Sequence, residues 1–201
     1  MKSARRVAVF AVVASAFTAR LLAAEAPSSW RIVRGEVRVV CPLTVGGSFE
    51  ARTTSLSGTL DVAAAAPAAL AGEIAVDLKT LDTGIGLRNE HMRTQYLEVG
   101  KGQGFDTAAL SDVHLLDLGG DAGQGRTRFT GTLLLHGTKR PIAGQADIRR
   151  EGAAARVDAS FPVVPAEYGI ASPRYLGVGV KDAVQVKVSL TAAPAASSGS
   201  R

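Results

Sequence analysis

Apolar and polar residues alternate with a period of two along most of the chain. Successive side chains of a β-strand point to opposite faces of a sheet, so this alternation predicts strands with one apolar and one polar face. Val184, Val186, Val188 and Leu190, for example, are separated by polar residues. Seven segments show the pattern clearly: 36–43, 56–62, 73–79, 128–135, 142–149, 156–163 and 184–190.

The spacing of these segments predicts an all-β fold. Residues 113–118 form a weaker eighth strand, and residues 30–33 extend the first. Glycine-rich turns separate the segments, and no long helical stretch is present to connect parallel strands. This spacing is typical of an antiparallel barrel or sandwich, and we predict a closed barrel of about eight strands, because closure removes exposed sheet edges. Residues 87–99 break the alternation with an approximate i, i+4 rhythm, which predicts a short helical insertion.

The inward positions of this predicted barrel carry small and medium side chains. Most of them are Val, Leu, Ile, Ala or Gly, and aromatic residues make up only 5% of the chain. A barrel of about eight strands holds either tightly packed side chains or one small ligand. Small inward residues favour an apolar cavity that takes an apolar guest. A densely packed barrel is the alternative that the pattern leaves open.

Candidate ligand-binding residues come from inward strand positions and from the segments expected at the cavity mouth. Large apolar side chains in loops or in a short helix are less needed for core packing, and a tyrosine hydroxyl can meet the polar end of a ligand. A plug that closes one barrel end is the alternative role for the mouth residues. The predicted ligand-binding set is Phe49, Leu60, Leu78, Met92, Tyr96, Phe105, Leu133, Leu135, Phe161, Tyr168, Ile170, Tyr175 and Leu176.

The N-terminal segment has the pattern of an export signal. Lys2, Arg5 and Arg6 precede an uncharged apolar run over residues 7–19. That run is shorter than the roughly 20 residues of a membrane span and fits the core of a signal peptide. We predict cleavage after Ala24 and a soluble mature chain in the periplasm or outside the cell. A membrane anchor or an amphipathic helix is the alternative.

The predicted domain organisation is a signal peptide over residues 1–24, a barrel over 25–192 and a disordered tail over 193–201, which contains only Ala, Pro, Ser, Gly and Arg. Without the four basic residues of the leader, the formal net charge falls from +5 to +1. A nucleic-acid partner requires a basic excess, so none is expected. A homodimer is left open, and the mature chain is expected to have no stable membrane span.

Few residues in the sequence favour metal or redox chemistry. The single cysteine excludes an intrachain disulfide, and Cys41 is expected to pack as a small apolar side chain. His91, His114 and His136 have no recognised zinc-ligand spacing, so no metal and no cofactor is predicted. His136 is expected to be a hydrogen-bonded histidine at a strand end.

Asp82, Glu90 and His91 are the residues that invite an acid–base interpretation. Their spacing is unspecific, and no nucleophile is positioned beside them. We therefore favour structural roles, in which Asp82 and Thr83 hydrogen-bond backbone amides of a turn and Glu90 forms a helical i, i+3 pair with Arg93. An enzyme that acts on a bound prenyl or acyl substrate is the alternative.

Several blocks of the sequence resemble the YceI-like, polyisoprenoid-binding family over roughly residues 30–192. Each block alone is short, but their joint order and spacing are specific. The matching blocks are GSF at 47–49, GTLD at 58–61, KTLDTG at 79–84, RNEHMRT at 88–94, YLEV at 96–99, GTLLLHGTKRP at 131–141, EYGI at 167–170, PRYLG at 173–177 and VKD at 180–182.

This resemblance implies a lipocalin-like barrel with a helix-containing insertion near its mouth and an elongated apolar pocket. It also implies an exported, soluble protein that binds an isoprenoid or other long-chain amphiphile without covalent chemistry, for sequestration or transport. The family's aromatic–proline pair is replaced by KGQGF at 101–105, which predicts a different loop geometry at the mouth. A packed barrel that acts as a protein-interaction module is the remaining interpretation.

Overall fold

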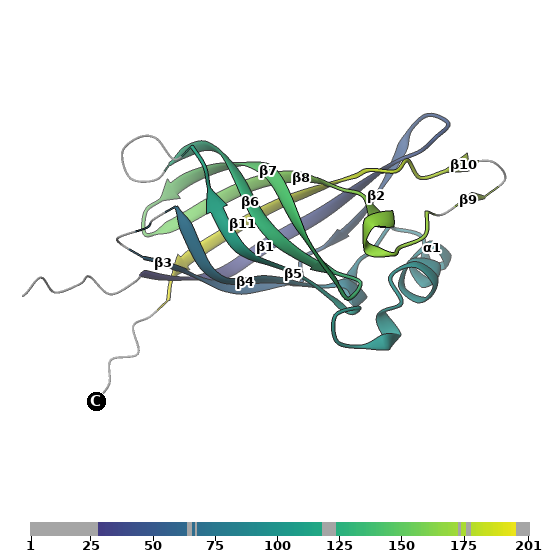
Figure 1. Ribbon diagram of the computed structural model, residues 1–201, viewed down its shortest axis with the longest axis horizontal. Helices are drawn as coiled ribbons and strands as arrows, with labels where there is room; N and C mark the ends of the chain where they lie inside the picture. Colours follow the sequence, from purple (N-terminus) through teal and green to yellow (C-terminus); the bar gives the residue numbers. More distant parts are fainter. Residues whose placement is uncertain are drawn as a thin grey trace, which may run out of the picture.

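The computed structural model describes residues 28–63, 66, 68–117, 124–172, 174–175 and 178–195, which form a β-barrel with a helical insertion at one end (Figure 1). The all-β prediction is confirmed. The strands are β1 (Ser28–Pro42), β2 (Ser48–Thr53), β3 (Leu56–Val62), β4 (Ala69–Asp77), β5 (Thr107–Leu115), β6 (Gly125–Leu135), β7 (Thr138–Glu151), β8 (Ala154–Val163), β9 (Arg174–Tyr175), β10 (Val178–Gly179) and β11 (Val184–Pro194).

The barrel closes because its first and last strands pair with each other. β11 is antiparallel to residues 30–40 of β1, which completes a ring in the order β11-β8-β7-β6-β5-β4-β3-β1. This ring confirms the predicted antiparallel barrel of eight strands. On its other edge, β1 pairs with β3 through residues 28–31 and with the additional strand β2 through residues 37–42.

Alternation fails as a predictor where a strand is short or bulged. β2 contributes few inward positions, and the sequence pattern misses it. β5 begins at Thr107 rather than at the predicted residue 113. Its register shifts between Ser111 and His114, where Asp112 has a φ of 51°. The bulge adds one residue to the strand, so the inward positions change parity and the period of two is interrupted.

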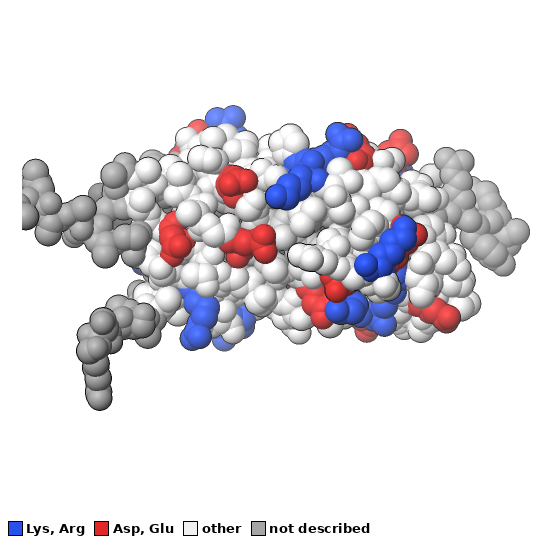
Figure 2. All heavy atoms as spheres, turned by 60° about the horizontal axis from the view of Figure 1, so that its bottom comes forward, with Lys and Arg blue, Asp and Glu red and all other residues white. Residues whose placement is uncertain are grey.

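Elsewhere the two faces of the wall follow the sequence pattern. Along β6, Thr127, Phe129 and Leu133 are buried, whereas the intervening Arg126 and Arg128 are exposed. Basic and acidic side chains are interspersed over the outer surface (Figure 2). The polar face therefore meets water, and the apolar face is turned into the barrel.

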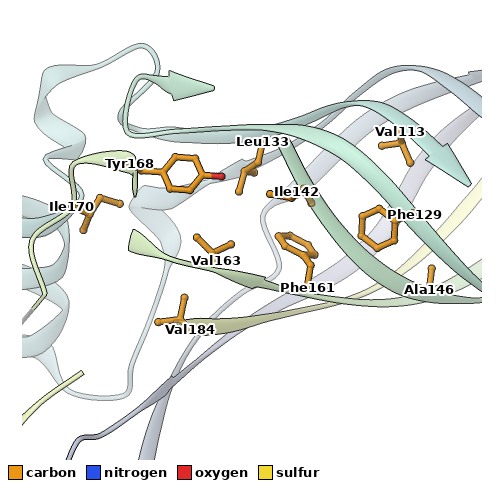
Figure 3. Packing of buried hydrophobic residues seen from close by; sticks show 10 residues of the cluster. All are labelled: Val113, Phe129, Leu133, Ile142, Ala146, Phe161, Val163, Tyr168, Ile170 and Val184. Atoms are coloured by element: carbon orange, nitrogen blue, oxygen red, sulfur yellow. The ribbon is translucent and has the colours of Figure 1, made fainter. Parts of the chain in front are cut away.

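Part of the interior is packed by aromatic and aliphatic side chains (Figure 3). The rings of Phe129 and Phe161 meet edge to face with centroids 6.0 Å apart. Gly144 lies opposite Phe129 in the β6–β7 ladder. A β-carbon at Gly144 would lie 2.5 Å from the carbonyl oxygen of Ser160 and 2.7 Å from the Phe129 ring, so only glycine leaves room for that ring.

The helical insertion follows β4 and confirms the prediction for residues 87–99, although it is not one regular helix. It begins with the 3₁₀ turn η1 (Leu78–Thr80), continues as α1 (Gly86–His91) and the π-helical η2 (Met92–Tyr96), and ends with the 3₁₀ turn η3 (Val99–Lys101). Leu78 and Leu81 pack with Ala51 of β2 beneath it. A further 3₁₀ segment, η4 (Pro165–Tyr168), follows β8 at the same end of the barrel (Figure 1).

The C-terminal boundary of the barrel lies beyond the predicted residue 192. β11 continues to Pro194, which pairs with Trp30, because the seam with β1 extends to that point. Residues 196–201 of the predicted tail and all of the predicted signal segment 1–24 lie outside the described residues. No helix among the described residues is long and apolar enough to cross a membrane.

The role of Gly144 is testable. We expect Gly144→Ala to lower the free energy of unfolding by about 1–3 kcal/mol, because the added methyl group overlaps the Phe129 ring and a backbone oxygen. Gly100→Ala is the matched control, since a β-carbon there meets nothing within 4 Å. Urea unfolding followed by circular dichroism measures both variants. Equal midpoints for the two would contradict the packing described here.

Candidate functional site: the barrel cavity

The inward faces of the barrel strands enclose one large cavity. Its volume is about 1820 Å³, well above the roughly 300–1,000 Å³ of typical small-molecule sites. Its wall consists mainly of aliphatic side chains of the barrel strands, such as Val39, Leu110, Val157 and Val186. Apolar side chains therefore form most of the inner wall along the whole barrel.

Side-chain exposure shows that this interior is hollow rather than filled. Val39, Leu110 and Val186 point inward, yet each is only half-buried because it faces the cavity. Among the described residues, no large side chain is less than 2% exposed. A densely packed barrel would bury these positions completely. The alternative of a densely packed barrel, which the sequence pattern left open, is therefore wrong.

Most of the predicted ligand-binding residues lie on this wall. The strands supply some of them, and the helical insertion supplies others near one end. The nine that line the cavity are Phe49, Leu60, Leu78, Met92, Tyr96, Leu133, Leu135, Phe161 and Ile170. Residues far apart in the sequence thus meet around a single apolar space.

Two predicted residues lie outside the cavity wall. Phe105 packs its ring edge against His136, with ring centroids 4.6 Å apart, beside the β6–β7 turn. Tyr168 is only 3% exposed and packs in the cluster that closes one side of the interior (Figure 3). Both are large apolar side chains needed for packing, as the plug alternative proposed. The Tyr175 side chain and Leu176 lie outside the described residues.

Polar residues at the two ends of the cavity were not among the predicted ligand-binding residues. At the end near the chain termini, the Arg150 guanidinium lies 4.7 Å from the Trp30 ring centroid. At the helical end, the Arg88 guanidinium lies 4.5 Å from the Phe49 ring centroid. Arg150 continues the inward series of β7 after Ala146 and Ile148, so its place on the wall was recoverable from the alternation.

The helical end also carries exposed apolar side chains. Ile85, Leu87 and Val178 are 48%, 63% and 37% exposed, and all three border the cavity. Val45, in the loop between β1 and β2, is 68% exposed. Thr44 connects that loop to β10, because its amide donates to the Gly179 carbonyl oxygen at 2.8 Å. The apolar interior is therefore continuous with the protein surface at this end.

Cys41 faces the cavity as the small apolar side chain that the sequence predicted. Burial raises the pKa of its thiol to about 11, against a smaller opposing effect of the Arg88 charge. The thiolate is therefore scarce at neutral pH, and the side chain is unreactive in the folded protein.

The sequence of this barrel matches the model of one protein family, described as the YceI-like domain, across residues 30–192. The chain belongs to the YceI-like family. No curated protein matches it. Several solved structures share the fold at low sequence identity, and the three named next are similar to this chain over most of their own length.

Burkholderia cenocepacia BcnA has a TM-score of 0.65 at 17% identity, covering 78% of this chain and 95% of its own. A polyisoprenoid binding domain from Saccharophagus degradans has a TM-score of 0.60 at 19% identity, covering 84% and 99%. The Campylobacter jejuni YceI protein has a TM-score of 0.51 at 14% identity, covering 70% and 81%. These likenesses show the barrel fold.

Within this YceI-like domain, Asp82 and Asn89 hold the start of the insertion. Asp82 Oδ1 accepts hydrogen bonds from Asn89 Nδ2 at 2.6 Å and from the Gly84 amide at 2.9 Å. Asn89 Oδ1 in turn accepts from the Thr83 amide at 2.8 Å and from its hydroxyl at 2.7 Å. The predicted turn role of Asp82 is confirmed, whereas the Thr83 hydroxyl bonds a side chain rather than a backbone amide.

The predicted pair between Glu90 and Arg93 is wrong. Arg93 donates instead to the carbonyl oxygen of Leu81 at 2.7 Å, and the described residues show no ion pair between Arg93 and Glu90. Glu90 and His91 are both exposed. Since Asp82 is occupied by the turn, this arrangement does not assemble the acid–base group that the enzyme alternative requires.

His136 connects three segments at the helical end. Its Nδ1 lies 2.9 Å from the Tyr168 carbonyl oxygen, and its Nε2 lies 2.9 Å from Glu98 Oε2. The predicted hydrogen-bonded histidine is confirmed. The glycine-rich segment 101–105 lies against the same turn, where the Gly104 carbonyl oxygen accepts from the Gly137 amide at 2.7 Å. The departure from the family pattern therefore affects the support beneath the insertion rather than the cavity wall.

The raised pKa of Cys41 predicts slow alkylation in the native state. At pH 8, we expect iodoacetamide to modify the folded protein about 100-fold more slowly than the urea-unfolded chain, because the thiolate fraction is lower. The folded pKa exceeds the unfolded value, so ionisation favours the unfolded chain as the pH rises from about 9 towards 11.

Mass spectrometry over time measures this reaction at the only cysteine of the chain. Cys41→Ser supplies the unlabelled control. Similar rates for the folded and unfolded chains would contradict burial of the thiol.

The hydrogen bonds to Asp82 predict an acid-range titration at the insertion. The Asn89 amide and the Gly84 amide lower the pKa of the Asp82 carboxyl below its ordinary value of 3.8. The support this carboxylate gives to the turn is therefore present above about pH 4 and is lost as the pH falls through the lower folded pKa.

The Gly84 amide resonance reports this titration. We expect its midpoint to lie below 3.8 in the wild type and to move upward in Asn89→Ala, where the largest cause is removed. A variant midpoint identical to that of the wild type would show that Asn89 does not stabilise the carboxylate.

Proposed function

We propose that the protein binds one long-chain amphiphile, an isoprenoid or acyl lipid, non-covalently inside the barrel. The observation that carries the proposal is the apolar cavity of about 1820 Å³ that opens between exposed apolar side chains at the helical end. Transfer of a hydrocarbon tail from water into such a space stabilises the complex by about 0.8 kcal/mol per CH₂. A long chain is thus held without any charged contact along its tail.

The comparisons support the same class of ligand. The chain belongs to the YceI-like family, and the structurally similar domain from Saccharophagus degradans is described as polyisoprenoid binding. Catalysis is not part of the proposal, because Asp82 serves the turn and the described residues of the cavity wall include no carboxylate. A wall that consists mainly of aliphatic side chains suits retention of a ligand.

The sequence of residues 1–24 supports a role outside the cytoplasm. A basic start followed by a short apolar run and small residues has the pattern of a cleaved signal peptide. We infer that the mature barrel acts in the periplasm or as a secreted protein. There it sequesters the lipid or carries it through water, in which the free tail is poorly soluble.

A charge on the cavity wall is expected to prevent binding. Leu133→Lys places an ammonium group on the wall, whereas Thr132→Lys places it on the outer face of the same strand. We expect affinity for the neutral probe N-phenyl-1-naphthylamine to fall at least about 10-fold in Leu133→Lys and to stay unchanged in Thr132→Lys. Probe fluorescence gives the affinity, and circular dichroism shows whether each variant is folded.

Ala159→Phe tests the cavity without adding charge, because a larger apolar side chain fills the space that a tail would occupy. Ser160→Phe on the outer face is its control. Unchanged affinity in folded Leu133→Lys and folded Ala159→Phe would reject the barrel interior as the binding site. Organic extracts of the purified protein that contain no long-chain lipid, together with no probe uptake, would reject the function itself.

A further inference from the structure

Apart from Cys41 and Tyr96, the titratable side chains on the cavity wall are all bases. Among the described residues, Arg88, His91, Arg150 and Lys181 line the cavity, and no carboxylate does. On the outer surface, by contrast, several basic residues have acidic partners, as where Arg128 Nε lies 2.6 Å from an Asp117 carboxylate oxygen. The cavity therefore carries positive charge that the described wall does not neutralise.

The Arg88 guanidinium and the backbone of Lys181 lie beside the same part of β1. The Arg88 guanidinium covers the ring of Phe49, which pairs with Cys41. The Lys181 amide donates to the Pro42 carbonyl oxygen at 2.8 Å, one residue further along. Arg88 is half-buried, and its aromatic contact leaves the guanidinium edge with N–H donors for an oxygen ligand.

The opposite end of the cavity is less suited to a polar head group. Arg150 there is exposed, as Lys181 is at the helical end, whereas Arg88 is half-buried, and Ser28 is a neutral polar residue of the wall at the Arg150 end. The helical end adds Ser48, Gln95 and Ser172 to its two cations. These neutral groups supply further hydrogen bonds around a bound anion.

We propose that the ligand carries an anionic head group, a carboxylate or a phosphate ester, which binds Arg88 and Lys181 while the tail fills the barrel. The inference rests on the proposed lipid-binding function and adds the chemistry and the orientation of the ligand. Charge-assisted hydrogen bonds to a guanidinium are about twice as strong as neutral ones, so they discriminate strongly between an acid and the corresponding alcohol. The exposed Ile85 and Leu87 flank the head group where the tail enters.

Paired ligands with identical tails test this inference. Oleate is compared with oleyl alcohol, and farnesyl phosphate with farnesol, by displacement of N-phenyl-1-naphthylamine below their micellar concentrations. We expect the wild type to bind at least one of the two anions about 10-fold more tightly than its alcohol. If the wild type prefers the anion in only one of the two pairs, the head group is a carboxylate for the oleate pair and a phosphate for the farnesyl pair.

Arg88→Gln is expected to remove most of this preference by weakening the binding of the anion more than the binding of the alcohol, and Lys181→Gln is expected to remove part of it. Arg150→Gln is the matched control and should keep the preference. Equal binding of acid and alcohol by the wild type would overturn the inference but not the lipid-binding function. Loss of the preference in Arg150→Gln alone would also overturn it, and failure of the neutral probe and all four amphiphiles to bind would overturn both proposals.

Discussion

The hydrogen-bonded seam between β1 and β11 is the contact on which the rest of the structure depends. Most small domains are held together by a filled core, but this barrel has a hollow one. The hydrogen bonds between its strands therefore contribute more to holding the fold together. The seam satisfies the edge groups of the first and last strands and turns every apolar face inward. Opening of the seam would expose two unpaired strand edges and the apolar inner wall to water at the same time. Continuation of the seam to Pro194 is consistent with this demand.

The interior divides into a packed part and an open part. Phe129 and Phe161 fill one region, and the glycine at position 144 provides the space that Phe129 needs. Elsewhere the wall consists of Val, Leu and Ala side chains that face each other across the hollow and remain half-buried. This open part is apolar surface that folding alone has not removed from water. A ligand that covers it completes the burial and stabilises the folded state by mass action.

The sequence alone predicts the barrel because period-two alternation is a local property of each strand. It does not predict the bulge at Asp112, where tertiary pairing adds one residue and reverses the inward parity of β5. The wall residues of the strands follow from the same alternation. The roles of the mouth residues do not follow from it. Phe105 and Tyr168 are large aromatic side chains of the kind that contact ligands, but they pack as structural supports. Arg88 was missed because its place on the cavity depends on how the insertion folds back over β2.

The placement of charge follows from the same hollow. An ion in the middle of an apolar cavity is strongly disfavoured, so basic side chains occur at its ends, where water reaches them. At both ends the guanidinium lies against an aromatic ring rather than beside a carboxylate. A ring attracts the cation without consuming its N–H donors, whereas a carboxylate would neutralise it and occupy them. The cavity thus combines an inert wall with cations that are held in position and still able to bind, which is the chemistry that an amphiphile with one polar end requires.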